Sequence, residues 1–253
     1  MNHHNPSLKI ALAGNPNCGK TALFNALTGM NQRVGNWAGV TVEKKTGHYD
    51  FHHQAHQVLD LPGTYALNAF THEGAEDQRI ACHALISESI DVIVNVVDAT
   101  NLERHLYLTM QLLELNIPVV IALNMTDRLA KVGKQVDCQQ LSRHLGCPVI
   151  PMVATNKQGI QALQAAVIKQ QATDRSSTPV QFADPIEKAI TCINQAVQTQ
   201  IDDVSQFSRW VILRLLEGEQ TCLPDLSLSL NNVVEHQRQQ ASFAMEEPID
   251  IMV

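Results

Sequence analysis

The chain has 253 residues, of which 45% are hydrophobic and 17% charged, a composition that excludes a disordered or low-complexity protein. Its apolar runs reach about seven residues, far short of the ~20 that a membrane-spanning helix needs. The net charge of −7 argues against nucleic-acid binding through a basic surface. The six cysteines form no C-x-x-C pair and the N-terminal residues show no signal-peptide pattern, so we expect a reducing, cytosolic compartment.

Charge is distributed unevenly along the chain. Residues 180–253 hold 11 Asp and Glu but only 4 Lys and Arg, which accounts for the whole net charge. Such a shift predicts two modules. The polar, proline-containing stretch 173–183 is the expected linker between a first domain, residues 1–172, and a second, residues 184–253.

The first domain alternates between strand and helix patterns. An apolar run at residues 8–13 ends at Gly14, and Lys20–Leu27 follows with a helical pattern. Later intervals are helical too, as in the repeat Leu102, Leu106, Met110 and Leu113. Further strand-like runs occupy residues 40–42, 57–61, 91–97, 118–124 and 148–153. This alternation predicts an α/β fold with a six-stranded, mostly parallel sheet and helices on both faces.

One pair of strands is expected to be antiparallel. The stretch Thr46–Gln57 between two strand-like runs is too short for a crossover helix, so those strands are predicted to form a hairpin.

The second domain is predicted to be small and all-helical. Asp184, Pro185 and Glu187 fit the N-cap, the first and the third positions of a helix. A second helix is expected from near Ser205, with Trp210 in the core and Gly218 at its end.

The last part of the chain allows two interpretations. The stretch from Leu226 fits a strand alternation as well as a helix, and we favour a helix that continues through Met245. Apolar residues continue to Val253, so we expect the sequence to be part of a longer chain.

The most specific motif is G-x-x-x-x-G-K-[ST] between a predicted strand and a predicted helix. Backbone N–H groups of such a loop and the positive end of its helix surround a β-phosphate. Lys20 places a charge between the β- and γ-phosphates, and Thr21 offers a hydroxyl to Mg²⁺. The expected nucleotide contacts are Gly14, Asn15, Pro16, Asn17, Cys18, Gly19, Lys20, Thr21 and Ala22.

A second element is Asp60-Leu61-Pro62-Gly63 at the end of a predicted strand. The Asp60 carboxylate can hold Mg²⁺ through water, and the Gly63 N–H can meet the γ-phosphate. Alone, this pattern is more often an ordinary strand exit. Its place downstream of the phosphate loop favours the functional interpretation.

A third element, Asn124-Met125-Thr126-Asp127, predicts guanine as the base. The Asp127 carboxylate can accept hydrogen bonds from N1–H and the exocyclic amine of guanine, a donor pair that adenine lacks. Met125 stands where a lysine is usual, and its thioether can cover the ring. An unrelated capping pair is the alternative. Backbone N–H groups after the last strand are expected to reach guanine O6, from Val153, Ala154 and Thr155.

These elements, in this order, resemble the Ras-like GTPase family over residues 8–171. Three further stretches resemble the cytosolic N-terminal part of the ferrous iron transport protein B family, namely Asn31–Glu43, Asp60–Tyr65 and Asn95–Ala99. The resemblance implies a G domain that binds GTP and GDP, then a helical domain that slows GDP release, then a membrane domain absent here. It also implies a soluble fragment at the cytosolic face of a bacterial inner membrane, where it regulates Fe(II) uptake.

The resemblance also assigns metal ligands. Thr41 corresponds to the second hydroxyl ligand of Mg²⁺ in the GTP form. Asn17, with the backbone carbonyls of Gly35 and Trp37, corresponds to a K⁺ site that would supply the charge of an arginine finger. The alternative is that Asn17 only shapes the loop.

Hydrolysis is expected to be slow. Thr64 stands after the D-x-P-G glycine, where related enzymes commonly have a water-orienting glutamine. The expected catalytic residues are Lys20, Asn17, Thr41, Gly63 and Thr64. One alternative is a nucleotide-gated binding module in which hydrolysis is secondary. Another is a P-loop kinase or ATPase, which the base-reading Asn124–Asp127 opposes.

Several other residues invite a functional interpretation that we do not favour. His52, His53 and His56 suggest an iron site but are typical of a solvated hairpin loop. Redox sensing by Cys18 would need a lowered thiol pKa. An oligomeric state is left open.

Overall fold

The computed structural model describes residues 7–29, 32–37, 39–67, 75–172, 181–201, 208–218 and 226–245. Contacts divide the chain into two units, residues 1–113 with 117–178 and residues 114–116 with 179–253. Most of the predicted linker 173–183 lies outside the described residues. Among the helices of these ranges, none combines the length and the apolar character that a membrane crossing requires.

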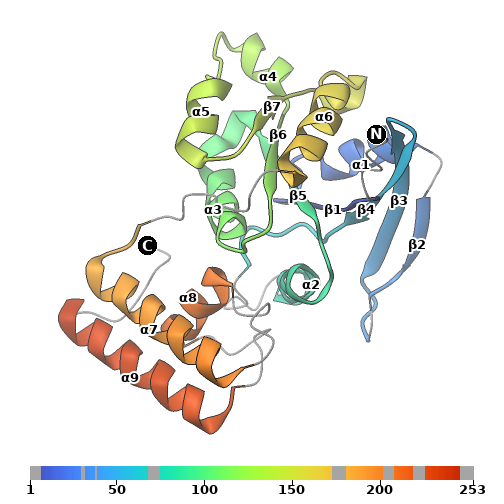
Figure 1. The fold of residues 1–253 in the computed structure, drawn as a ribbon. Helices are drawn as coiled ribbons and strands as arrows, with labels where there is room; N and C mark the ends of the chain where they lie inside the picture. Colours follow the sequence, from blue (N-terminus) through green and yellow to red (C-terminus); the bar gives the residue numbers. More distant parts are fainter. Residues whose placement is uncertain are drawn as a thin grey trace, which may run out of the picture. The chain divides into compact units, whose positions relative to one another are not determined.

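The first unit is built on a seven-stranded, mostly parallel sheet in the order β2-β3-β4-β1-β5-β6-β7 (Figure 1). Its strands are β1 (Lys9–Gly14), β2 (Gln32–Asn36), β3 (Glu43–Phe51), β4 (Gln54–Asp60), β5 (Val92–Asp98), β6 (Val119–Asn124) and β7 (Val149–Pro151). From β4 to β7 all neighbours are parallel, while β3 is antiparallel to both β2 and β4. The predicted α/β architecture is confirmed, with one strand more than expected.

The additional strand, β2, carries no apolar alternation that could have revealed it. All five of its residues are exposed, and it pairs with β3 in a register that sets Gly35 opposite Lys44. The predicted strand at Val40–Val42 is wrong. Those residues lie in the turn between β2 and β3, where the Val40 N–H bonds to the Trp37 carbonyl, and β3 begins only at Glu43.

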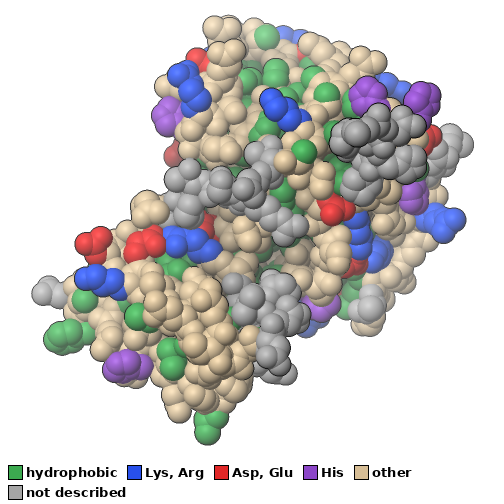
Figure 2. All heavy atoms as spheres, in the orientation of Figure 1, with side chains coloured by type: hydrophobic (Ala, Val, Ile, Leu, Met, Phe, Trp, Pro, Cys, Tyr) green, Lys and Arg blue, Asp and Glu red, His purple; other side chains and the backbone are tan. Residues whose placement is uncertain are grey.

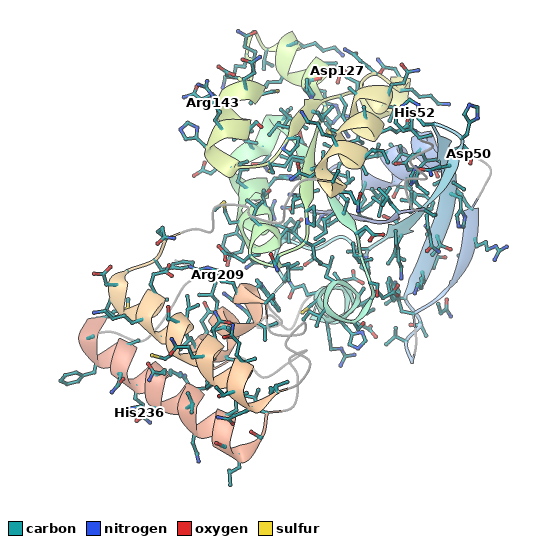
Figure 3. All side chains as sticks on the ribbon, viewed as in Figure 1. Asp50, His52, Asp127, Arg143, Arg209 and His236 are labelled. Carbon is teal, nitrogen blue, oxygen red and sulfur yellow. The ribbon has the colours of Figure 1, made fainter. Side chains whose placement is uncertain are left out.

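The predicted antiparallel hairpin is present as β3 and β4. Its two-residue turn is His52-His53, with φ of 51° and 62°. Two successive positive φ values are the signature of a turn that matches the twist of the flanking strands. Both histidines are exposed, and Figure 3 shows His52 at the hairpin tip.

Helices cover both faces of the sheet because its strands are apolar on both sides. Residues of α1 and α6 belong to one core cluster. Partly buried residues of α3 and α5 pack against a second cluster. The helices of this unit are α1 (Lys20–Thr28), α2 (Ala75–Ser87), α3 (Leu102–Leu113), α4 (Thr126–Lys131), α5 (Cys138–Leu145) and α6 (Ile160–Gln171). On the face drawn in Figure 2, acidic and basic side chains are scattered rather than gathered by sign.

The second unit contains three helices among its described residues, α7 (Asp184–Gln200), α8 (Arg209–Glu217) and α9 (Leu228–Met245). Helices α7 and α9 pack along each other (Figure 1). The helical interpretation of the stretch after Leu226 is confirmed. Trp210 is buried, and α8 ends at Gly218 with φ of 81°, as predicted.

One predicted helix start is displaced. Asp184 is not the N-cap of α7 but its first residue, because Ala183 holds the cap position without a side-chain hydrogen bond. Helix α8 is described from Arg209, where the Ser208 hydroxyl accepts the Val211 N–H at 3.4 Å as its cap, and the predicted start near Ser205 lies outside the described residues.

Candidate nucleotide site

The phosphate-binding motif forms the loop between β1 and α1, as predicted. Gly19 precedes α1 with φ of 92°, and a Cβ there would lie 2.2 Å from Asn124 Nδ2. At Gly14 a Cβ would lie 2.6 Å from the Val96 carbonyl oxygen. Both positions exclude a side chain. The loop can therefore present its N–H groups to an anion at close range.

Cys18 is buried beneath this loop. Burial raises the pKa of its thiol to about 11, although Lys20 acts in the opposite direction. A thiol with that pKa stays protonated at neutral pH. The lowered pKa that redox sensing requires is therefore absent.

Lys20 and Asp60 lie together, as the two motifs predict. Lys20 Nζ is 2.6 Å from Asp60 Oδ1, and both side chains are nearly buried. Strand β4 places Asp60 here because it runs parallel to β1, with Asp60 opposite Leu12. The exposed Thr21 follows Lys20, so a hydroxyl, a carboxylate and an ammonium are grouped at one end of the central strands.

Gly63 and Thr64 run directly past the phosphate loop. A Cβ on Gly63 would lie 3.3 Å from Pro16 Cα. Thr64 is buried, and its N–H donates to the Gly14 carbonyl at 3.2 Å. Its hydroxyl donates to the Ala66 carbonyl. The hydroxyl and the N–H of Thr64 are thus both engaged within the chain.

The base-reading elements are joined by Asn124. Its Nδ2 donates to the Cys18 carbonyl at 3.0 Å, and its Oδ1 accepts the Ala154 N–H at 3.0 Å. One buried carboxamide thereby connects the phosphate loop to the loop after β7. Met125 borders the site, since its methyl lies 3.6 Å from the position of a Cβ on Gly19.

Asp127 lies in the first turn of α4, where Figure 3 shows it on the surface. Its carboxylate is half-exposed and 4.0 Å from Lys131. In the loop after β7, the N–H groups of Val153 and Ala154 bond within the chain. Thr155 follows them in a short 3-10 helix, Ala154–Asn156.

The expected metal ligands Gly35, Trp37 and Thr41 lie in β2 and in the turn that follows it. Gly35 is in β2, and Trp37 and the exposed Thr41 follow it, so β3 and β4 separate this segment from β1. Asn17 is exposed in the phosphate loop with φ of 65°, a conformation that asparagine tolerates well. Asn17 and Gly35, both expected to bind K⁺, thus belong to segments that follow or lie in strands separated by β3 and β4.

The three histidines are not brought together as a metal site. His52 and His53 are exposed, whereas His56 is buried and accepts the Leu8 N–H through Nδ1 at 3.2 Å. Within the described ranges, no group of three metal-ligating side chains occurs.

Sequence reasoning missed Gln111 of α3. Its buried Oε1 accepts the Leu67 N–H at 2.6 Å and so fixes the segment after Gly63 to α3. The two residues are 44 positions apart and match no motif. No local signal could have revealed this bond.

Family comparisons agree with this geometry. Residues 8–167 match the family model for ferrous iron transport protein B, and residues 182–253 match the FeoB cytosolic helical domain. The chain belongs to the ferrous iron transport protein B family. Two relatives, each called Fe(2+) transporter FeoB, come from Salmonella typhimurium and Escherichia coli K12. They are 47% and 46% identical to this chain over 212 residues. The matched region is 84% of this chain but 27% of each relative.

Solved FeoB structures have the same fold. An asparagine-to-alanine variant of S. thermophilus NFeoB bound to mGDP matches with a TM-score of 0.84 and 36% identity, covering 96% of this chain and 92% of that one. The cytosolic domain of T. maritima FeoB in its GMPPNP form matches with a TM-score of 0.77 and 30% identity, covering 96% and 100%. The fold of the FeoB cytosolic region is therefore common to all three.

Proposed function

We propose that this chain binds GTP and GDP and slowly hydrolyses GTP as the cytosolic module of a bacterial ferrous iron transporter. The observation that carries the proposal is the glycine-lined phosphate loop joined through Asn124 to the base-reading loops. The nucleotide named for the S. thermophilus neighbour supports it. The module would act at the inner face of the membrane and regulate Fe(II) uptake through a membrane domain that lies outside this sequence.

Oxygen ligands suited to Mg²⁺ are grouped beside Lys20. The Asp60 carboxylate and the Thr21 hydroxyl are of the type that this hard cation prefers, with Thr41 as the ligand added in the triphosphate form. When bound, Mg²⁺ neutralises charge on the β- and γ-phosphates. Lys20, which pairs with Asp60 at 2.6 Å, would exchange that partner for phosphate oxygens.

Slow hydrolysis is supported by the position of Thr64. Because its hydroxyl and N–H bond to Ala66 and Gly14, Thr64 offers little to an attacking water. In this proposal the Gly63 N–H would hold the γ-phosphate, and Asn17 with the carbonyls of Gly35 and Trp37 would hold a K⁺ ion whose positive charge would stand in for that of an arginine finger. K⁺ should then stimulate hydrolysis relative to Na⁺ in single-turnover measurements.

Calorimetry with GDP and ADP in Mg²⁺ tests the base assignment. We expect heat with GDP and much weaker binding of ADP. The variant Asp127→Asn should shift the preference from guanine to xanthine nucleotides, because the amide then pairs with the altered base edge. Equal affinity for GDP and ADP in the unaltered chain would refute guanine recognition.

A nucleotide-gated binding module is the second candidate, favoured by the internal bonding of Thr64. The variant Thr41→Ala separates the two functions. Loss of partner binding with unchanged single-turnover hydrolysis would favour the module, whereas loss of hydrolysis alone would favour the enzyme.

A further inference from the structure

Trp37 is buried although it follows a strand whose residues are all exposed. Its side chain is 8% exposed, while all five residues of β2 face solvent. Its N–H donates to the Val42 carbonyl at 3.0 Å, and its own carbonyl accepts the Val40 N–H at 3.3 Å. The turn that follows β2 is thereby closed on itself, and the carbonyl expected to bind K⁺ is engaged.

Lys44 of β3 covers the indole ring. Its ammonium lies 4.4 Å from the ring centroid of Trp37, within the range of a cation–π interaction. The indole Nε1 is buried and has no hydrogen-bond partner within the part of the chain that the structure describes. Packing and the ammonium of Lys44, rather than a hydrogen bond of the indole, therefore hold this ring.

Glu88 fixes the position of that ammonium. Lys44 Nζ donates to Glu88 Oε1 at 2.6 Å, and Lys9 donates to the other carboxylate oxygen. Burial alone would raise the pKa of Glu88, but the hydrogen bonds from Lys44 and Lys9 outweigh burial and lower it. Glu88 directly follows α2 and belongs to neither phosphate-binding motif.

We propose that Lys44 and Glu88 are positioning residues that hold Trp37 and its turn at the sheet edge, and so favour the diphosphate form of the protein over the triphosphate form. The inference rests on the proposed function, in which Thr41 and the Gly35 and Trp37 carbonyls serve the triphosphate. Strands β3 and β4 separate Gly35 from β1 while β2 stays paired, and Trp37 is held in the turn that follows β2. Each contact that keeps Trp37 beneath Lys44 therefore opposes triphosphate binding.

The test uses the full 253-residue chain with Mg²⁺ and compares Glu88→Gln and Lys44→Gln. Lys45→Gln is the matched control, because the neighbouring Lys45 pairs with Glu43 at 3.1 Å. Calorimetry gives the affinities for GDP and GMPPNP. Loss of one cation–π contact predicts a rise of about threefold to tenfold in the ratio of GMPPNP to GDP affinity, with GDP affinity within about twofold of the unaltered chain. An unchanged ratio in both variants overturns the proposal.

A second readout needs no nucleotide. The chain has two tryptophans, so 5-fluorotryptophan labelling gives two ¹⁹F resonances, and Trp37→Phe identifies one of them. We expect the Trp37 resonance to move in Glu88→Gln and Lys44→Gln but not in Lys45→Gln. An unchanged resonance in the first two variants refutes the proposal that Lys44 and Glu88 position Trp37. If the unaltered chain gave no heat with any guanine nucleotide, the proposed function would fail instead. The ¹⁹F spectrum would still test whether Lys44 and Glu88 position Trp37.

Discussion

Replacement of Asn124 by alanine removes the carboxamide that joins the phosphate loop to the loop after β7. Its two hydrogen bonds, both 3.0 Å long, pair the Cys18 carbonyl and the Ala154 N–H in a buried setting. A buried backbone group left unpaired costs about 1–3 kcal/mol. Because Asn124→Ala orphans two such groups, we expect the free energy of unfolding to fall by about 2–5 kcal/mol.

Urea unfolding followed by circular dichroism measures that loss, and amide hydrogen exchange at Ala154 reports the local opening. The variant Asn124→Asp keeps an acceptor for Ala154 but loses the donor to Cys18 and places a carboxylate in the same buried setting, so its loss should be at least as large as that of Asn124→Ala. Asn156→Ala is the control. Its side chain accepts the Gln158 N–H at 3.0 Å in an exposed turn, and its removal should cost less than about 0.5 kcal/mol.

The reasoning would be refuted if Asn124→Ala unfolded within about 0.5 kcal/mol of the unaltered chain, the range of ordinary surface substitutions. It would also fail if Asn156→Ala cost as much. GDP affinity should fall together with stability, because Gly19 has its close contact with the same carboxamide.

Three further predictions concern separate regions. Asn17→Ala should abolish the excess of K⁺-supported over Na⁺-supported hydrolysis while GDP affinity, measured by calorimetry, is retained. Burial lowers the pKa of His56 below 6.5, so the unfolded chain binds a proton at this imidazole more readily than the folded chain, and the free energy of unfolding should fall as the pH drops below 6.5. In urea unfolding, His56→Gln should reduce this dependence of stability on pH, whereas His53→Gln, at an exposed position, should not. Arg209→Met should cost about 3 kcal/mol in thermal unfolding, because it removes the guanidinium that pairs with the nearly buried carboxylate of Glu114 and the partly buried carboxylate of Glu187.

Much of the fold could be predicted because the central strands are largely apolar. Strands β1, β5 and β6 are buried on both faces almost throughout, and β4 is buried in its second half, so these runs read clearly from sequence. β2 could not be predicted, because an exposed edge strand depends on its ladder with β3 rather than on apolar side chains. The predicted strand at Val40–Val42 was wrong for a related reason, since its apolar residues lie in the turn between β2 and β3.

Helix α3 illustrates the limit of periodicity. The repeat at Leu102, Leu106, Met110 and Leu113 identified the helix, yet those residues are only half-buried. Polar residues of α3 are more buried, because they bond to distant backbone and side-chain groups. These buried polar residues are His105, Thr109 and Gln111.

The sequence by itself determined the order of the motifs and the chemistry each can perform, because a glycine-lined loop, its lysine and a strand-end carboxylate are local patterns. Only the tertiary structure decided which of them meet. It brought Lys20 to Asp60 and Asn124 to Ala154 through strands that are neighbours in the sheet, and Asn124 to Cys18 across β5, which lies between β6 and β1. It also paired β2 at the sheet edge and buried the Trp37 indole, because these features depend on contacts such as that of Lys44 with Glu88, between residues far apart in the chain, which no local pattern encodes.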